Sequence, residues 1–143
     1  MAQLYRTDFY SWAMEQATLA RAGRLDGLDL EHVAEELEAL GRSEAAALKS
    51  SLRVLLVHLL KWQYQPERRS RSWTNSIDRE RDNIEDHLRD NPGLRPRLAE
   101  LLRQAYALAR REAARQTRLP LETFPLDCAQ SLEQITAQDW LPQ

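Results

Sequence analysis

Apolar residues recur at every third or fourth position along most of this chain, which is the spacing that one face of an α-helix requires. The first two stripes of this kind occupy residues 9–20 and 30–40, and a loop at residues 24–28 separates them. Each stripe follows a residue that can cap a helix and precedes a glycine that can end one. These caps and stops are Asp8 or Thr7, with Gly23, for the first predicted helix, and Asp29 and Gly41 for the second.

The third predicted helix is the most apolar segment of the chain. It starts near Ser43 and ends near Gln65, because Pro66 restricts the backbone of the residue before it. Leu, Val and Trp occupy most positions from Leu52 to Trp62, so this helix is apolar on more than one face. A helix of this kind is typically buried, which places it at the centre of the predicted bundle.

Two further amphipathic stripes and a proline-bearing tail complete the pattern. The fourth stripe begins at Trp73, and the fifth begins near Pro96 and continues to Gln116. Prolines interrupt the tail but leave room for a short helix near residues 131–135, and the apolar residues of the tail are expected to pack onto the bundle. The sequence therefore predicts an all-α fold, a single-domain helical bundle over residues 1–143 with about five main helices and a short C-terminal helical tail.

Composition narrows the class of protein without identifying an activity. The 143 residues suit one compact domain, and the net charge of −2, from 20 basic and 22 acidic residues, argues against broad adhesion to nucleic acid or to an anionic membrane. The single Cys128 cannot form an internal disulfide. The N-terminus lacks the apolar core of a signal peptide, and the apolar run at residues 54–60 is too short to span a bilayer. We expect a cytoplasmic protein that does not contact a membrane.

A cluster of polar and aromatic residues stands in the third predicted helix. His58, Lys61 and Trp62 lie at positions i, i+3 and i+4, which share one surface of a helix and could bind an anion or a carboxylate. The alternative is structural: Trp62 belongs to the core, Lys61 covers apolar surface with its stem, and His58 makes one hydrogen bond at the boundary. Because buried polar residues of helices usually have structural partners, the structural interpretation is favoured.

Three glutamates of the second predicted helix form a carboxylate row at positions i, i+4 and i+7. Glu35 and Glu38 could act with His58 in a metal-assisted hydrolase, although the sequence has no close His-x-x-x-His or Cys-x-x-Cys pattern for a transition metal. A solvated helix face, or an ion-pair seam with Arg42 and Arg53, is the favoured interpretation. The row consists of Glu31, Glu35 and Glu38.

A basic and aromatic segment follows the third predicted helix. Arg68, Arg69 and Arg71 precede Trp73, and such a combination can bind phosphate while an aromatic ring stacks on a base. An arginine five residues before His58 also has a spacing found in some helical ribonucleases, where these residue types handle phosphate and proton transfer. Pairing of the basic segment with nearby acidic residues is the favoured alternative.

Several sequence blocks follow one another in order, and the central nine-residue run with His, Lys, Trp and Pro is the most specific of them. The blocks are Asp8-Phe-Tyr-Ser-Trp12, Glu35-Glu-Leu-Glu-Ala-Leu-Gly41, His58-Leu-Leu-Lys-Trp-Gln-Tyr-Gln-Pro66, Ser72-Trp73, Asn91-Pro-Gly-Leu94 and Phe124-Pro125 with Cys128. In this combination the chain resembles, over nearly its whole length, the bacterial helical family described as domain of unknown function twenty-nine. Ala129 stands after Cys128 where that pattern has a proline. The resemblance implies a bacterial, all-helical protein, and it brings no established activity or catalytic residue.

No catalytic motif accompanies this resemblance. The sequence contains no Gly-rich phosphate loop, nucleophile elbow or dinucleotide fingerprint, so no cofactor is expected, and Cys128 is expected to serve packing. The leading hypothesis is a non-enzymatic helical interaction module that binds a protein partner or a second copy of itself. The alternatives are a nucleic-acid-binding or RNA-cleaving protein that uses residues 68–73, and the metal-assisted hydrolase.

Overall fold

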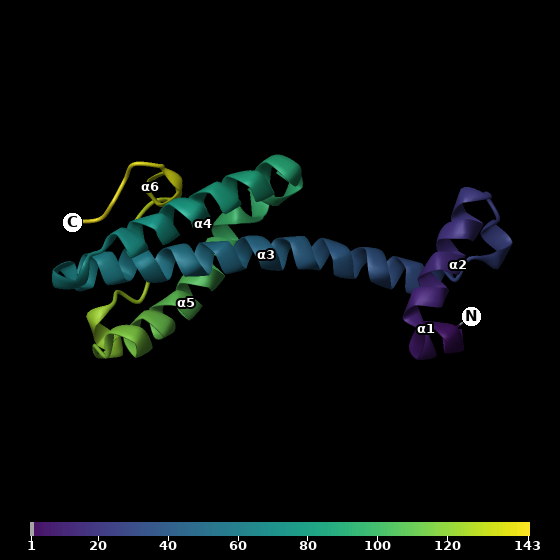
Figure 1. The fold of residues 1–143 in the computed structure, drawn as a ribbon, viewed down its shortest axis with the longest axis horizontal. Helices are drawn as coiled ribbons and strands as arrows, with labels where there is room; N and C mark the ends of the chain where they lie inside the picture. The colour runs from purple at the N-terminus through teal and green to yellow at the C-terminus, as the bar shows by residue number, and fades with distance from the viewer. Residues whose placement is uncertain (1) are drawn as a thin grey trace. The chain divides into compact units, whose positions relative to one another are not determined.

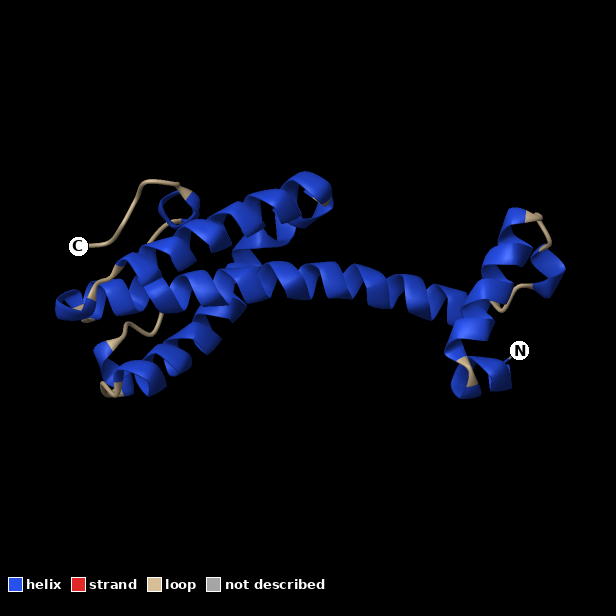
Figure 2. Ribbon diagram, viewed as in Figure 1, coloured by secondary structure: helices blue, strands red, loops and turns tan. Residues whose placement is uncertain are grey.

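The computed structural model describes residues 2–143, and helices make up most of this chain (Figure 1, Figure 2). No strand occurs among these residues, so the all-α prediction is confirmed. None of the helices in this range combines the length and the apolar character that crossing a bilayer requires. The α-helices are α1 (Ala2–Thr7), α2 (Phe9–Arg21), α3 (Leu30–Tyr64), α4 (Arg71–Asp90), α5 (Leu98–Thr117) and α6 (Leu132–Thr136). Short 3-10 turns stand at Leu25–Gly27, Pro66–Arg68, Pro92–Arg97 and Leu121–Thr123.

The chain divides into two compact units, and each is described by itself. The N-terminal unit is Met1–Ser43, and the C-terminal unit is Glu44–Gln143. Helix α3 contributes its first part to the N-terminal unit and the remainder to the C-terminal unit. A single domain over residues 1–143 stays a prediction.

Helix α3 is longer than the sequence predicted. The expected helix end at Gly41 is wrong, because the backbone continues without interruption from Leu30 to Tyr64 as one helix of 35 residues. A glycine inside a helix costs only about 1 kcal/mol, and good helix formers surround this one. An ion pair of 3.7 Å between Arg42 and Glu38, one turn apart, spans the same position. The described chain therefore has four long helices, α2 to α5, and two short ones, α1 and α6.

Replacing Gly41 by alanine should raise the free energy of unfolding by about 1 kcal/mol. The added Cβ would meet no atom within 4 Å, and alanine has the higher helix propensity. Gly23 is the matched control, because its Cβ would also enter open space but its φ of +69° disfavours any side chain. Urea unfolding should show Gly41→Ala more stable and Gly23→Ala less stable than the parent. Equal shifts of the two variants would contradict a continuous helix at Gly41.

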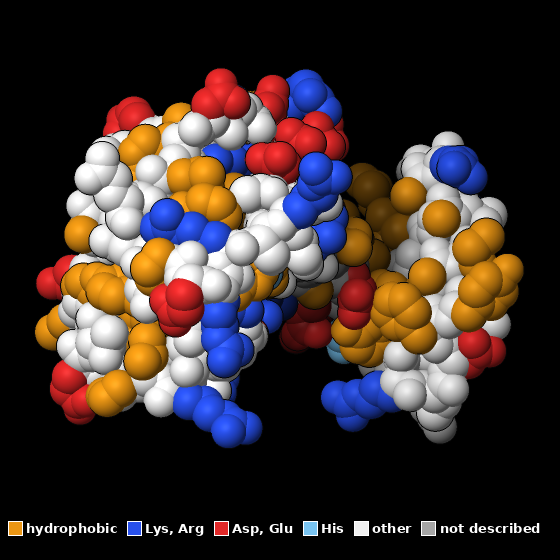
Figure 3. Space-filling view, turned by 60° about the vertical axis from the view of Figure 1, so that its left-hand side comes forward, with side chains coloured by type: hydrophobic (Ala, Val, Ile, Leu, Met, Phe, Trp, Pro, Cys, Tyr) orange, Lys and Arg blue, Asp and Glu red, His pale blue; other side chains and the backbone are white. Residues whose placement is uncertain are grey.

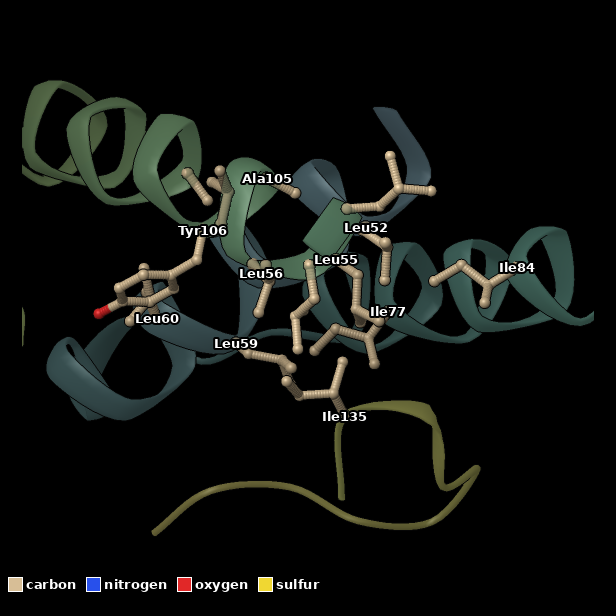
Figure 4. Close-up of a cluster of buried hydrophobic side chains, with 14 of the residues drawn as sticks. Leu52, Leu55, Leu56, Leu59, Leu60, Ile77, Ile84, Ala105, Tyr106 and Ile135 are labelled. Carbon is tan, nitrogen blue, oxygen red and sulfur yellow. The ribbon is translucent and has the colours of Figure 1, made fainter. Parts of the chain in front are cut away.

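The core of the C-terminal unit forms around the second part of α3, as the sequence predicted. Leu48, Leu52 and Leu55 are completely buried. Complete burial of a leucine side chain contributes about 1.5 to 3 kcal/mol, so this row alone accounts for much of the unit's stability. In Figure 4, the leucines of α3 face side chains from α4, α5 and α6. These partners include Ile77, Ile84, Ala105, Tyr106 and Ile135.

The C-terminal tail packs onto this core, which confirms the prediction for it. Phe124 and Ile135 are buried, and Trp140 packs against the same cluster. A complete capping box starts α6, in which the side chain of Ser131 accepts from the backbone of Gln134 and the Gln134 side chain accepts in return. Local capping and apolar burial together give the tail a defined path.

Arg81 of α4 binds the tail from within the unit. Arg81 is 2% exposed, and its guanidinium donates to four backbone carbonyl oxygens of the tail. Burial lowers the pKa of Arg81 from its ordinary value, but the group stays charged at neutral pH because that value is so high. The acceptors are the carbonyls of Ile135 (2.8 Å), Trp140 (2.8 Å), Gln138 (3.2 Å) and Gln134 (3.4 Å).

Candidate functional site

The predicted cluster of His58 and Lys61 lies in the C-terminal unit, and both side chains have structural partners. The Nδ1 of His58 donates to the carbonyl oxygen of Val54 at 2.9 Å, one turn earlier in α3. The Nζ of Lys61 donates to Oε1 of Gln116 at 3.0 Å and lies 4.8 Å from the ring centre of Trp73. The His58 contact is the single boundary hydrogen bond that the structural interpretation predicted, and Lys61 has polar and aromatic partners.

Trp62 is partly buried, so its predicted place in the core is wrong. The guanidinium of Arg69 lies 4.8 Å from the Trp62 ring centre, while its Nε donates to the Trp62 carbonyl at 2.8 Å. Arg69 also donates to the carbonyl of Gln143 at 3.0 Å. This cation–π contact covers the Trp62 ring at the edge of the core. Replacing Trp62 by alanine would therefore cost less stability than replacing a fully buried tryptophan.

The basic and aromatic segment is partly occupied by contacts within the chain. Arg69 contacts Trp62, and the ring of Trp73 faces the ammonium of Lys61. A ring with a cation over it offers less surface on which a base could stack. Arg68 and Arg71 are exposed.

The carboxylate row lies on α3 in the N-terminal unit, whereas His58 belongs to the C-terminal unit. Glu35 and Glu38 are both exposed, and Glu38 pairs with Arg42. In residues 2–143, no three His, Cys, Asp or Glu side chains gather as metal ligands would. The row thus has the features of a solvated helix face.

Arg53 and His58 point in different directions from α3. Arg53 binds Oε2 of Glu112 on α5 at 2.7 Å, whereas the charges that act on His58 include Arg79 and Glu80 of α4. Five residues of an α-helix turn the side chains about 140° apart. Arg53 thus pairs with a residue of α5, whereas His58 bonds within α3, and the two side chains do not converge on one reacting atom.

Cys128 borders a cavity of about 460 Å³ in the C-terminal unit, beside Tyr106. Burial raises the pKa of the Cys128 thiol from its ordinary value, and burial likewise raises the pKa of Tyr106 to about 12. Both groups are protonated at neutral pH, and the Tyr106 hydroxyl donates to the Pro125 carbonyl at 2.5 Å. A nucleophilic cysteine needs the opposite shift, so Cys128 does not have the properties of a nucleophile.

The burial of His58 predicts a pH dependence of stability. Burial lowers the pKa of His58 below its ordinary 6.5, and the positive charges of Lys61 and Arg79 act in the same direction. The unfolded chain then binds a proton more readily than the folded one, so stability is full above about pH 6.5 and falls as pH drops below it. Urea unfolding at about pH 7.5 and 5.5 should show a smaller loss for His58→Gln than for the parent. The same loss in both proteins would mean that His58 titrates normally.

The N-terminal unit contains a polar cluster around Asp29. The Oδ2 of Asp29 accepts from Nε1 of Trp12 at 3.1 Å and from Nδ1 of His32 at 2.8 Å. Its backbone N–H donates to Oε1 of Gln16 at 2.8 Å. Burial raises the pKa of Asp29, but the hydrogen bonds from His32 and Trp12 outweigh it and leave the pKa below its ordinary value. Asp29 thereby joins α2 to the start of α3 as a charged carboxylate.

Tyr5 of α1 extends this cluster. Its hydroxyl donates a short hydrogen bond to Oε1 of Glu36, and this bond raises the pKa of Tyr5 to about 12. The Tyr5 ring stacks on His32 with centres 4.1 Å apart and meets Trp12 edge to face at 4.7 Å. Three helical segments are thus fixed to one another by polar and aromatic contacts in place of a large apolar core.

Beside this cluster lies an open groove of about 530 Å³ between α2 and the first part of α3. Leu37 is 63% exposed and Leu40 64%, and Phe9 is about half exposed. We call this feature the apolar groove. Its apolar lining includes Phe9, Ala13, Ala17, Val33, Leu37 and Leu40, and the side chains of Trp12, Gln16 and Glu36 complete it.

Most of the exposed large hydrophobic side chains belong to the N-terminal unit. Orange side chains are visible on this unit in Figure 3. Of the nine large hydrophobic side chains that are exposed in the described chain, seven belong to this unit. The other two are Leu108 and Leu126. The seven are Phe9, Tyr10, Met14, Leu25, Leu30, Leu37 and Leu40.

Comparison with protein families decides the classification. The family model described as Domain of unknown function DUF29 matches residues 4–141, which is nearly the whole chain. The chain belongs to this family. The match confirms the resemblance found in the sequence, and the family description names no activity. No curated protein and no solved structure gives a significant match.

In this DUF29 chain, reasoning from the sequence missed the residues that build the N-terminal unit. Asp29 was predicted as a helix cap, and the structure adds that its carboxylate accepts from Trp12 and His32. The spacing Asp29-x-x-His32 places the two side chains one turn apart and could have indicated this contact. Tyr5 and Glu36 are 31 residues apart, and no local pattern predicts their hydrogen bond.

Proposed function

We propose that this protein is a non-enzymatic interaction module that binds another protein chain through the apolar groove. One observation carries the proposal: seven of the nine exposed large hydrophobic side chains of the described chain belong to the N-terminal unit that forms this groove. Three of the seven, Phe9, Leu37 and Leu40, line the groove together. Exposed apolar surface gathered in a groove is typical of sites where another protein binds.

The energetics of the N-terminal unit support the proposal. Among its described side chains, Trp12 is the only apolar one that is buried. A segment of about 40 residues seldom supports a fold without a further stabilising element such as a disulfide, a metal or association. Covering a leucine completely contributes about 1.5 to 3 kcal/mol, so a partner over Leu37 and Leu40 would supply the missing stability.

The other hypotheses gain less support from the arrangement of side chains. Trp73 and Arg69 of the basic segment already have partners in the chain, and the Glu35 row and His58 belong to different compact units. Nucleic-acid binding, RNA cleavage and metal-assisted hydrolysis therefore stay predictions. A cytoplasmic location belongs to the proposal as well, since the one cysteine leaves no internal disulfide to form.

Site-specific photo-crosslinking tests the proposal. A benzophenone amino acid replaces Leu37 in the full chain, the protein is expressed at its natural level in the cells that make it, and ultraviolet light is applied. Leu126 is the matched control position, because it is 76% exposed in the C-terminal unit while Leu37 is 63% exposed in the groove.

The expected result is a discrete protein adduct from position 37 and no comparable adduct from position 126. Mass spectrometry then identifies the attached chain, either another protein or a second copy. Adducts that are absent from position 37, or equally abundant at both positions, would contradict the proposed function.

A further inference from the structure

The positive charge of the C-terminal unit is concentrated in two short segments. Residues 61–73 and 111–118 contain seven basic and two acidic residues, a net charge of +5, whereas the rest of the chain carries a net charge of −7. The near-neutral total of −2 therefore conceals a strong separation of charge. We call these two segments together the basic end. A local excess of one charge attracts ligands of the opposite charge.

The two segments lie side by side at one end of the C-terminal unit, where α3 and α5 end and α4 begins (Figure 1). The Nζ of Lys61 donates to Oε1 of Gln116 at 3.0 Å. One turn later in α3, Nε2 of Gln65 donates to the carbonyl oxygen of Thr117 at 3.5 Å. The fold thus brings together arginines that are far apart in the sequence.

Five arginines of the basic end are exposed and have no partner for their guanidinium groups. In the described part of the chain, none of these five groups makes a hydrogen bond, an ion pair or a ring contact. The other two basic residues, Lys61 and Arg69, are held by contacts within the unit. A guanidinium presents its donors in a planar fork that matches the oxygens of a phosphate. The five are Arg68, Arg71, Arg111, Arg115 and Arg118.

The arginines at the end of α5 oppose the local stability of the chain. Arg111 and Arg115 lie one turn apart, and like charges at that spacing destabilise a helix. Arg118 has a φ of +61° and is the only residue other than glycine with a positive φ in the described chain. A glycine would adopt this backbone with less strain. Such costs are expected where side chains serve a ligand.

The tryptophans of the basic end are covered within the unit. Lys61 lies over the ring of Trp73 and Arg69 over the ring of Trp62, each 4.8 Å from the ring centre. A base would find little ring surface on which to stack, so stacking at Trp73 is disfavoured. The exposed arginines instead favour contact with phosphates, which carry no sequence information.

The distribution of the five arginines favours a nucleic acid over a membrane. They belong to the turn at Pro66–Arg68, to α4 and to α5 or its C-cap, which suits a ligand with several phosphates in a row. Membrane surfaces are usually bound by basic and apolar side chains together. Outside the N-terminal unit, the exposed large hydrophobic side chains of the described chain are Leu108 and Leu126, and neither belongs to the basic end.

We infer that the basic end binds the phosphodiester backbone of a nucleic-acid duplex without reading its bases. A duplex presents the phosphates of two strands at a fixed spacing, whereas single strands are bound largely through stacked bases. The surface belongs to the C-terminal unit, so the inference does not depend on the proposed function of the apolar groove.

Fluorescence anisotropy of the full chain with labelled duplexes of about 20 base pairs tests this inference. The protein should bind at about 50 mM salt, and the dissociation constant should rise by about 40-fold or more at about 200 mM, as three or more phosphate contacts predict. Two duplexes of unrelated sequence should bind within about threefold of each other. DNA and RNA duplexes share the phosphodiester chemistry, and the one that binds more tightly identifies the ligand.

Paired substitutions separate the basic end from the overall charge. Arg115→Gln together with Arg118→Gln should raise the dissociation constant by about 10-fold or more at low salt. The matched control is Arg95→Gln together with Arg97→Gln, because both arginines are exposed, lie outside the basic end and remove the same charge. This control should stay within about threefold of the parent. Circular dichroism should show the helix content of the parent in both double variants.

The substitution Arg118→Gly distinguishes a ligand contact from a structural role. Glycine suits the positive φ, so urea unfolding should show a higher midpoint than for the parent, while duplex binding weakens by about threefold. An arginine that serves only structure would show no loss of binding.

A parent protein that binds neither duplex at about 50 mM salt overturns the inference. Equal weakening by the two double variants also overturns it, because the effect would then be one of net charge alone. Vesicles with about 30% phosphatidylserine serve as a further comparison, and binding to them in place of the duplexes would likewise contradict the inference.

Discussion

Replacing Arg81 by methionine should lower the free energy of unfolding by about 3 to 5 kcal/mol. Arg81 is 2% exposed, and its guanidinium donates to four backbone carbonyls of the C-terminal tail. Hydrogen bonds from a charged donor contribute about 1.5 to 3 kcal/mol each, and a buried carbonyl without a donor is costly. The expected loss of stability is smaller than the sum of four such hydrogen bonds, because the tail can move away and its carbonyls can then bind water.

Urea unfolding followed by circular dichroism measures this loss. Arg79→Met is the matched control, since Arg79 is an exposed arginine on the same helix and should change stability by less than about 0.5 kcal/mol. Arg81→Lys should recover only part of the stability, because one ammonium cannot reach carbonyls on several sides as the planar guanidinium does. Similar stabilities of the methionine variants at 79 and 81 would show that Arg81 does not bind the tail.

Replacing Trp12 by alanine should cost about 3 to 5 kcal/mol in the N-terminal unit. Trp12 is 3% exposed and is the only buried apolar residue among the described side chains there. Its indole N–H donates to Asp29, and its ring contacts Tyr5, so the substitution removes packing and also leaves a carboxylate with one donor fewer. Few other contacts can compensate in so small a unit.

Amide hydrogen exchange locates this effect. Amides of α2 should exchange much faster in Trp12→Ala, while amides of α4 and α5 in the C-terminal unit keep their protection. Tyr10→Ala is the control, because Tyr10 is 74% exposed on the same helix. A uniform loss of protection across the chain would instead mean that the two compact units unfold as one.

The sequence predicted well those features that depend on neighbouring residues. Asp8 caps α2 by accepting from the Ser11 backbone, Ser131 caps α6, and the apolar row of α3 forms the core. Capping and helical periodicity act over three or four residues, so both can be recognised from spacing alone. The predicted helix end at Gly41 was wrong, because a glycine is tolerated inside a helix when its neighbours favour the helix.

The apolar groove and the contacts around Asp29 could not be predicted from the sequence, for a different reason. Leu30, Val33, Leu37 and Leu40 were recognised as an apolar stripe, but a stripe that faces a core and a stripe that faces a second chain have the same spacing. The partners of Tyr5 and Trp12 lie 31 and 17 residues away, and only the fold brings them together. Exposure of an apolar side chain depends on which elements pack beside it.

Hydroxyl-radical footprinting of the full chain at natural concentration in a lysate of its own cells tests the central claim directly. Leu37 and Leu126 are a matched pair, with 63% and 76% exposure and the same intrinsic reactivity. If a protein chain covers the apolar groove, Leu37 is oxidised several-fold more slowly than Leu126, and Tyr10, 74% exposed and outside the groove lining, reacts freely. Oxidation of Leu37 at nearly the rate of Leu126 would contradict the claim that the groove is an interaction site.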